Sequence, residues 1–156
     1  TAILLGQLAG GAVYGAVLAL FFCLVVAPFT GPLEAGVVGY LVMVAVGMLM
    51  AIAFGGLSVA LGIRTGSVEA AQGAFPLYFV LIFVSSAFFP TALMRRTYRT
   101  VANANPITWL IDAIRDLTLE PLALRPVLTA LAVSAAFAVG GLALAHAALN
   151  ARLKAS

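Results

Sequence analysis

Charged side chains are absent from four long stretches of this sequence, which are residues 1–33, 35–63, 70–94 and 126–151. A helix needs about 20 apolar residues to cross the ~30 Å hydrocarbon core of a membrane, and each stretch is longer than that. Runs such as residues 77–84 are apolar at every position, whereas a transmembrane barrel requires alternation of apolar and polar residues. The pattern therefore predicts an all-α, polytopic helical membrane protein with four transmembrane helices.

Turn-forming residues divide the chain into these helices. Two prolines and a glycine in residues 28–32 end the first helix, because proline and glycine interrupt helical hydrogen bonding. The second helix is longer than a bilayer requires, so it tilts or bends, with Gly55-Gly56 as the expected bend. Ser67 is the expected cap of the third helix and Pro90 its end. The expected helices cover about residues 6–27, 33–63, 68–89 and 126–150 of a single transmembrane domain, residues 1–156.

Residues 91–125 connect the last two helices and hold five of the eight basic residues and three of the five acidic ones. Asn105-Pro106 is typical of a helix start, with asparagine as the cap and proline in the first turn. Apolar residues then recur at helical spacing, and Trp109 is a residue type that prefers the headgroup level. We expect an interfacial or re-entrant amphipathic helix here. Its apolar residues are Ile107, Leu110, Ile111, Ile114 and Leu117.

The overall composition agrees with a membrane protein. Hydrophobic residues make up 64% of the chain and charged residues 8%, against about 45–50% and about 25% in soluble domains. The net charge of +3 comes from bases scattered beside the expected spans. They form no stripe along a helix, so we expect no nucleic-acid binding.

Residues that carry chemistry are missing from the expected spans. An ion-coupled carrier needs a carboxylate near the bilayer midplane, whereas Glu34 and Glu69 lie at helix starts, where the helix dipole accounts for them. The chain has a single histidine, His146, and a single cysteine, Cys23. These two residues cannot form a zinc site without carboxylates. We therefore expect no catalytic, cofactor-binding or metal-binding residue, and no enzyme activity.

A phosphate-binding loop is also missing from the printed sequence. The single lysine is Lys154, and no Gly-Lys-Ser/Thr occurs, although such a loop requires one. If this chain transports a substrate, we expect ATP and Mg²⁺ to be bound by a partner subunit.

Small residues recur four apart in the first two expected helices. This spacing lets two helix backbones approach closely. The partner face belongs either to the same subunit or to a second subunit, and the spacing does not distinguish these alternatives. The candidate helix-packing residues are Gly6, Gly10, Gly11, Gly15, Gly47 and Gly55.

A small basic cluster, Arg95, Arg96 and Arg99, follows the third expected span. Such residues anchor a chain at the lipid headgroups by extending their charged ends toward water. They also suit contact with an anionic lipid or substrate. Both interpretations remain open at this point.

Three motifs resemble the type-2 export permeases of ATP-binding cassette transporters. They are Gly66-Ser67-Val68-Glu69-Ala70-Ala71-Gln72 at a helix start, Ser85-Ser86-Ala87-Phe88-Phe89-Pro90 at its end, and the segment from Asn105 to Arg115, with Pro106, Thr108 and Trp109 near its start. The order of spans around the amphipathic segment also fits, so the resemblance covers essentially the whole chain.

The resemblance implies that these are the last four spans of a six-span subunit, with two spans upstream of Thr1. It also implies pairing with a second permease copy, identical or different, on two ATP-binding cassette ATPase subunits in a cell (inner or plasma) membrane. Residues 91–125 are then on the outer side, where the amphipathic helix re-enters the membrane as part of the exit gate. The gate residues implied by the motif are Asn105, Pro106, Trp109, Asp112 and Arg115.

The distribution of basic residues favours the opposite orientation. Five arginines lie in residues 91–125 and three bases lie at the other ends of the spans, and basic residues usually lie on the cytoplasmic side. We keep the family orientation, because the upstream segment that the resemblance implies would supply further cytoplasmic charges and re-entrant segments distort the count.

The sequence thus predicts an export permease subunit for an amphipathic drug, lipid or lipid-linked glycan, energised by a separate ATPase. The alternative is a non-transporting four-span membrane scaffold, for which the same glycine faces would serve.

Overall fold

The computed structural model describes every residue of the chain except 1, 74 and 156. The described residues form helices and no strand. The long helices are α1 (Ala2–Thr30), α2 (Gly36–Thr65) and α7 (Leu124–Ala155). Between α2 and α7 lie α3 (Val68–Gln72), α4 (Phe75–Phe83), the 3₁₀ turn η1 (Thr91–Leu93), α5 (Arg96–Ala104) and α6 (Pro106–Leu119).

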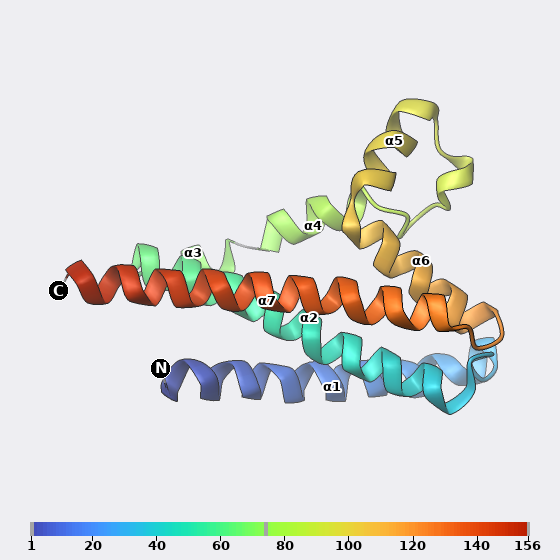
Figure 1. Cartoon of the computed structure of the whole chain (residues 1–156), viewed down its shortest axis with the longest axis horizontal. Coiled ribbons are helices and arrows are strands. Elements are labelled where there is room, and N and C mark those ends of the chain that lie inside the picture. Colours follow the sequence, from blue (N-terminus) through green and yellow to red (C-terminus); the bar gives the residue numbers. More distant parts are fainter. Residues whose placement is uncertain (1, 74, 156) are drawn as a thin grey trace.

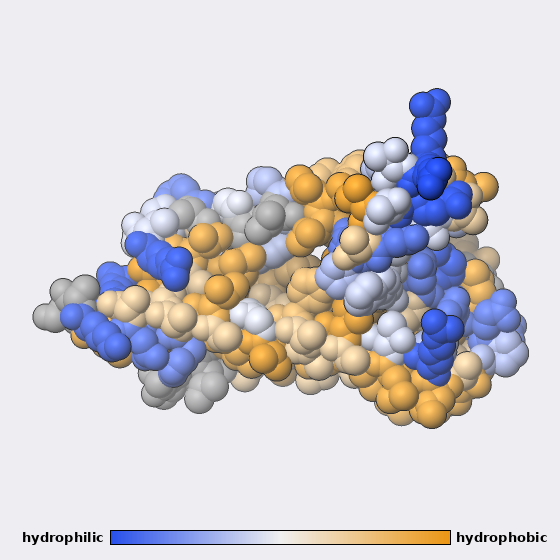
Figure 2. All heavy atoms as spheres, turned by 45° about the horizontal axis from the view of Figure 1, so that its top comes forward, coloured by the Kyte–Doolittle hydropathy of each residue, from blue (hydrophilic) through white to orange (hydrophobic). Residues whose placement is uncertain are grey.

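The three long helices lie side by side, with α2 between α1 and α7 (Figure 1). Each is long and apolar enough to cross a membrane. Both chain termini lie at one end of this layer, and α5 and α6 lie at the other (Figure 1). Hydrophilic side chains gather at these two ends and apolar ones cover the long helices between them (Figure 2). The all-helical membrane fold is therefore confirmed.

Residues 68–89 differ from the single helix expected there. They form α3 and α4, followed by turns and bends from residue 84 onward. Pro76 lies in the first turn of α4, where its missing N–H costs nothing. The helix ends at Phe83, seven residues before Pro90, where side chains pair two of its last four carbonyls. Among the residues that the structure describes, three helices rather than four therefore meet the length and composition of a membrane span.

Glycines set the ends of α1 and α2. Gly31, with φ 82°, follows α1, and its N–H donates to the carbonyl of Ala27 (2.9 Å). Gly66, with φ 69°, ends α2 in the left-handed conformation and donates to the carbonyl of Gly62. Glycine adopts this conformation without steric cost. Both helices end later than expected from the ranges 6–27 and 33–63: α1 ends at Thr30 and α2 ends at Thr65.

Two pairs of glycines bring the long helices into backbone contact. A Cβ added at Gly15 would lie 2.6 Å from the Cβ of Ala51, and one added at Gly47 would lie 2.6 Å from the Cβ of Ala19. On the other face of α2, a Cβ added at Gly56 would lie 2.5 Å from the carbonyl carbon of Gly141. Real Cβ atoms do not approach so closely, so glycine is required at these four positions.

The other candidate packing glycines have no such role within this chain. Added Cβ atoms at Gly6, Gly10 and Gly11 meet nothing within 4 Å, and one at Gly55 meets only the end of Leu8 at 3.7 Å. The spacing of four residues therefore identified the α1–α2 contact at Gly15 and Gly47. The α2–α7 contact at Gly56 and Gly141 was not predicted, although a small residue follows each glycine four positions later, at Ala60 and Ala145.

The Gly141 contact predicts that an added methyl group lowers stability at position 141 but not at the adjacent position 140. Gly141→Ala places a Cβ 2.8 Å from the Cα of Ala53, so it forces α2 and α7 apart. We expect it to lower the unfolding midpoint of the detergent-purified protein by several degrees, as for an overpacked core site. Gly140→Ala meets open space and is expected to leave the midpoint unchanged or slightly raised. Equal midpoints for the two variants would contradict this packing.

Candidate functional site

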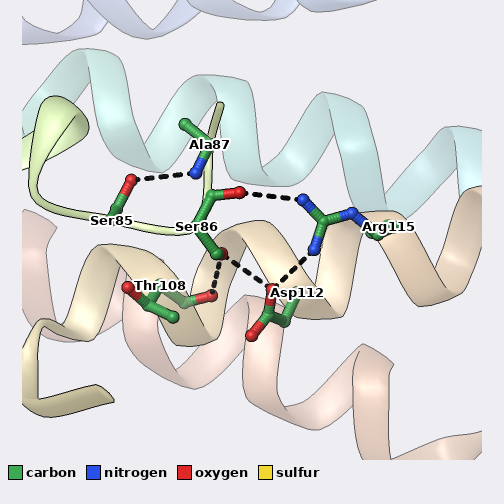
Figure 3. A network of polar contacts seen from close by, with 6 residues as sticks. All are labelled: Ser85, Ser86, Ala87, Thr108, Asp112 and Arg115. Carbon is green, nitrogen blue, oxygen red and sulfur yellow. Dashed lines mark hydrogen bonds and ion pairs between the residues drawn. The ribbon is translucent and has the colours of Figure 1, made fainter. Parts of the chain in front are cut away.

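The richest cluster of polar contacts lies where α4 ends and α6 passes beside it (Figure 3). Ser85 and Ser86, in the bent segment after α4, are buried. The last carbonyls of a helix have no intrahelical partner, and a buried carbonyl left unpaired costs about 1–3 kcal/mol. The end of α4 therefore needs donors from elsewhere.

Donors for the last four carbonyls of α4 come from the following turn and from α5 and α6. The carbonyl of Leu81 accepts from Asn105 Nδ2 (2.7 Å), and that of Phe83 accepts from the hydroxyl of Tyr98. The other two carbonyls are paired locally, by Val84 N with Val80 (3.0 Å) and by Ser85 N with Ile82 (3.1 Å). We call these contacts the α4 cap.

Asn105 joins two helices. Its Nδ2 donates to the end of α4, while its Oδ1 accepts from the backbone N–H of Ile107 (3.0 Å) and so caps the start of α6. Only 8% of Asn105 is exposed. Pro106, directly after it, provides the first residue of α6. The helix start expected at Asn105-Pro106 is confirmed, and the contact with α4 adds a second reason for asparagine.

Ser86, Asp112 and Arg115 form a second connection, which we call the Ser86 clasp (Figure 3). The hydroxyl of Ser86 donates to Asp112 Oδ1 (2.7 Å), and Arg115 donates to the same oxygen (2.8 Å). Arg115 also donates to the backbone carbonyl of Ser86 (2.9 Å). A guanidinium suits this arrangement because it offers several donors in a fixed plane. The charged pair of α6 thereby holds the backbone of the bent segment.

Thr108 lies against the same segment, and its backbone carbonyl accepts weakly from the Ser86 hydroxyl (3.5 Å). Its own side-chain oxygen is buried and has no hydrogen-bond partner among the described residues. Such a group costs about 1–3 kcal/mol relative to a satisfied one. Thr108 therefore contributes packing rather than hydrogen bonding.

Trp109 lies three residues before Asp112 on α6 and is 51% exposed. Its Nε1 donates to the backbone carbonyl of Asn103 (2.9 Å). Trp109 and Pro106 line an apolar groove of about 540 Å³, whose other walls come from α2, α4 and α7. Of the five residues that the motif implied for a gate, the structure thus brings Asn105, Asp112 and Arg115 to the end of α4 and turns Trp109 to this groove.

The basic cluster divides into two parts. Arg99 donates to the carbonyls of Ala92 (2.6 Å) and Met94 (3.0 Å), so it holds η1 against α5. Arg95 and Arg96 are exposed. Headgroup or substrate contact therefore stays a prediction for Arg95 and Arg96, while Arg99 has a structural partner.

Sequence reasoning missed Ser86 and Tyr98 as members of this site. Ser86 belongs to a quoted motif but carried no assigned role, and nothing near Tyr98 indicated that its hydroxyl reaches a helix end. No group of three or more potential metal ligands occurs among the described residues.

The sequence pattern of a known family covers most of the chain. Residues 1–119 match the family described as ABC-2 type transporter. No curated protein and no solved structure matches the chain significantly. The matched residues include α1 to α6 and therefore both the α4 cap and the Ser86 clasp.

Asn105 offers a test that separates its two roles. Asn105→Asp keeps an oxygen for the start of α6 but removes the donor to Leu81. We expect it to destabilise the protein by about 1–3 kcal/mol, the cost of an unpaired buried carbonyl. Asn105→Ala should cost a further ~1 kcal/mol for the lost cap. The free energy of unfolding is measured in detergent, with exposed Asn103→Ala as control. A wild-type value for Asn105→Asp would contradict the α4 cap.

Proposed function

The chain belongs to the ABC-2 type transporter family, and from this premise we propose that it forms the translocation path of an exporter. An ABC-2 chain is a membrane component of a transporter, and its long apolar helices agree with that role. We propose that the substrate is an amphipathic drug, lipid or lipid-linked glycan. A separate ATP-binding cassette ATPase subunit supplies the energy, and two permease copies enclose the path.

The observation that carries this proposal is the polar connection between α4 and α6. The break after Phe83 leaves backbone groups that only the α5–α6 segment satisfies. A helix end held by a few directional contacts can be released and remade, whereas a continuous apolar helix has no such point of release. We propose that α4 and α6 form the outer gate. Residues 68–89 then span the membrane in addition to α1, α2 and α7, and α6 re-enters it from the outer side.

We propose that α1, α2 and α7 form a rigid support against which this gate moves. The contacts at Gly15, Gly47, Gly56 and Gly141 join α1, α2 and α7 by backbone approach. At the other end, the N–H groups of Glu34 and Ala35 donate to the carbonyls of Thr118 and Leu117 (3.3 and 3.4 Å). The C-terminal end of α6 is therefore fixed to the start of α2. We propose that the N-terminal end of α6, which carries Asn105, moves with α4.

The Ser86 clasp predicts which variants impair transport. Arg115→Lys retains the charge but cannot donate to both Asp112 and Ser86 from one plane. We expect ATP-driven transport to fall about tenfold, as for loss of a charge-assisted hydrogen bond, while the partner's ATP hydrolysis continues. Transport is measured in proteoliposomes that contain the complete transporter, with a fluorescent phospholipid and a lipophilic cationic dye as probes.

Thr108→Val is the matched control for this experiment. The substitution is on the same helix and removes a buried hydroxyl without a partner, so transport should stay at the wild-type value and stability should stay unchanged or rise. Wild-type transport by Arg115→Lys would contradict the clasp. If the wild-type complex hydrolyses ATP but transports neither probe, the result would instead favour the alternative that the chain is a non-transporting scaffold.

A further inference from the structure

A groove between α6 and α7 has a charged end and an apolar end. Asp116, Arg125 and Thr129 line a polar pocket of about 480 Å³ at the charged end. The apolar groove of about 540 Å³ follows along α7 as far as Leu144. Trp109 lines both, so the two pockets form one surface with Trp109 at the boundary.

The apolar part offers a ligand no free hydrogen-bonding side chain. Apart from hydrocarbon side chains and glycine, its lining holds Tyr78 and Trp109. The hydroxyl of Tyr78 already donates to the carbonyl of Phe54 (2.9 Å), and Nε1 of Trp109 donates to that of Asn103. A sugar or peptide would leave its own polar groups unpaired there, at a cost of about 1–3 kcal/mol each. A hydrocarbon chain loses nothing.

The length of the groove fits one leaflet of a bilayer. Its α7 wall runs from Ala132 to Leu144, which is ~18 Å at ~1.5 Å per residue. Half of the ~30 Å hydrocarbon core is ~15 Å. The boundary at Trp109 corresponds to the headgroup level, where tryptophan is enriched.

The charged end presents both signs of charge. Asp112 is engaged by Arg115 and Ser86, whereas neither Asp116 nor Arg125 enters an ion pair within the described part of the chain. Both are exposed and both line the polar pocket. A phosphate complements Arg125, and an ammonium with N–H donors complements Asp116.

We propose that this groove holds one phosphatidylethanolamine molecule of the surrounding bilayer. Its acyl chain lies along α7 below Trp109, and its headgroup lies between Asp116 and Arg125. The bound lipid fills the space between α6, α7 and α4. This inference needs the chain to lie in a membrane but does not need it to export a substrate.

Lipid binding is tested on the purified full-length protein after delipidation in detergent. Native mass spectrometry follows the titration with phosphatidylethanolamine, phosphatidylcholine and phosphatidylglycerol of identical acyl chains. We expect one phosphatidylethanolamine to bind about fivefold more tightly than the others, because phosphatidylcholine lacks N–H donors and phosphatidylglycerol lacks the ammonium. Equal affinity for the three lipids would overturn the headgroup assignment.

Variants locate the bound lipid. Ala136 lines the groove, so Ala136→Trp should abolish the tight adduct, whereas Ala147→Trp, at an exposed position of α7 outside the groove, should retain it. Asp116→Asn should remove the preference for phosphatidylethanolamine, and Arg125→Gln should weaken binding of all three lipids. Both charged residues are exposed, so these two variants serve even if Ala136→Trp does not fold.

Two results would contradict the proposal. One is equal retention of the lipid by Ala136→Trp and Ala147→Trp. The other is displacement of the lipid from the wild-type protein by a lipophilic cationic dye, which would assign the groove to a transported substrate. The assay involves no ATP hydrolysis, so its failure is distinct from failure of the export proposal.

Discussion

A helix end that is buried must pair its last carbonyls, and this requirement organises the structure around α4. Where water is excluded, each unpaired carbonyl costs about 1–3 kcal/mol. Asn105 and Tyr98 supply side-chain donors to carbonyls at the end of α4 that lie 24 and 15 residues earlier in the chain. The position of α5 and α6 is therefore coupled to the place where α4 stops, and a shift of either element leaves the other with unpaired groups.

The long helices are held together in a different way. Their backbone groups are paired within each helix, so they associate by close approach rather than by hydrogen bonds. The glycines at positions 15 and 47 and at positions 56 and 141 permit that approach on opposite faces of α2. The structure thus combines three closely packed helices, α1, α2 and α7, with a segment from α4 to α6 that is held by polar contacts. This difference is the physical basis of the proposal that the long helices stay fixed while α4 and α6 move.

The sequence predicts the long helices well, because unbroken apolar runs have few alternatives in a membrane. It also predicts the start of α6, since Asn105-Pro106 is a strong local signal. The end of α4 could not be predicted in this way, because residues 77–84 are apolar and Pro90 is the nearest evident stop. The break at Phe83 depends on contacts with Tyr98 and Asn105, which only the folded chain brings near. The Ser86 clasp was hidden for the same reason, although Asp112 and Arg115 are three residues apart on one helix.

The central claim is that the bent segment after α4 is released and remade during transport. Hydrogen exchange of the amides in residues 84–89 tests it directly in the complete transporter, with the ATPase subunit free of nucleotide or loaded with ATP. The account predicts faster exchange of these amides with ATP, while the amides of α1 and α2 around Gly15 and Gly47 stay unchanged. Equal exchange of the amides of residues 84–89 in both states would contradict it.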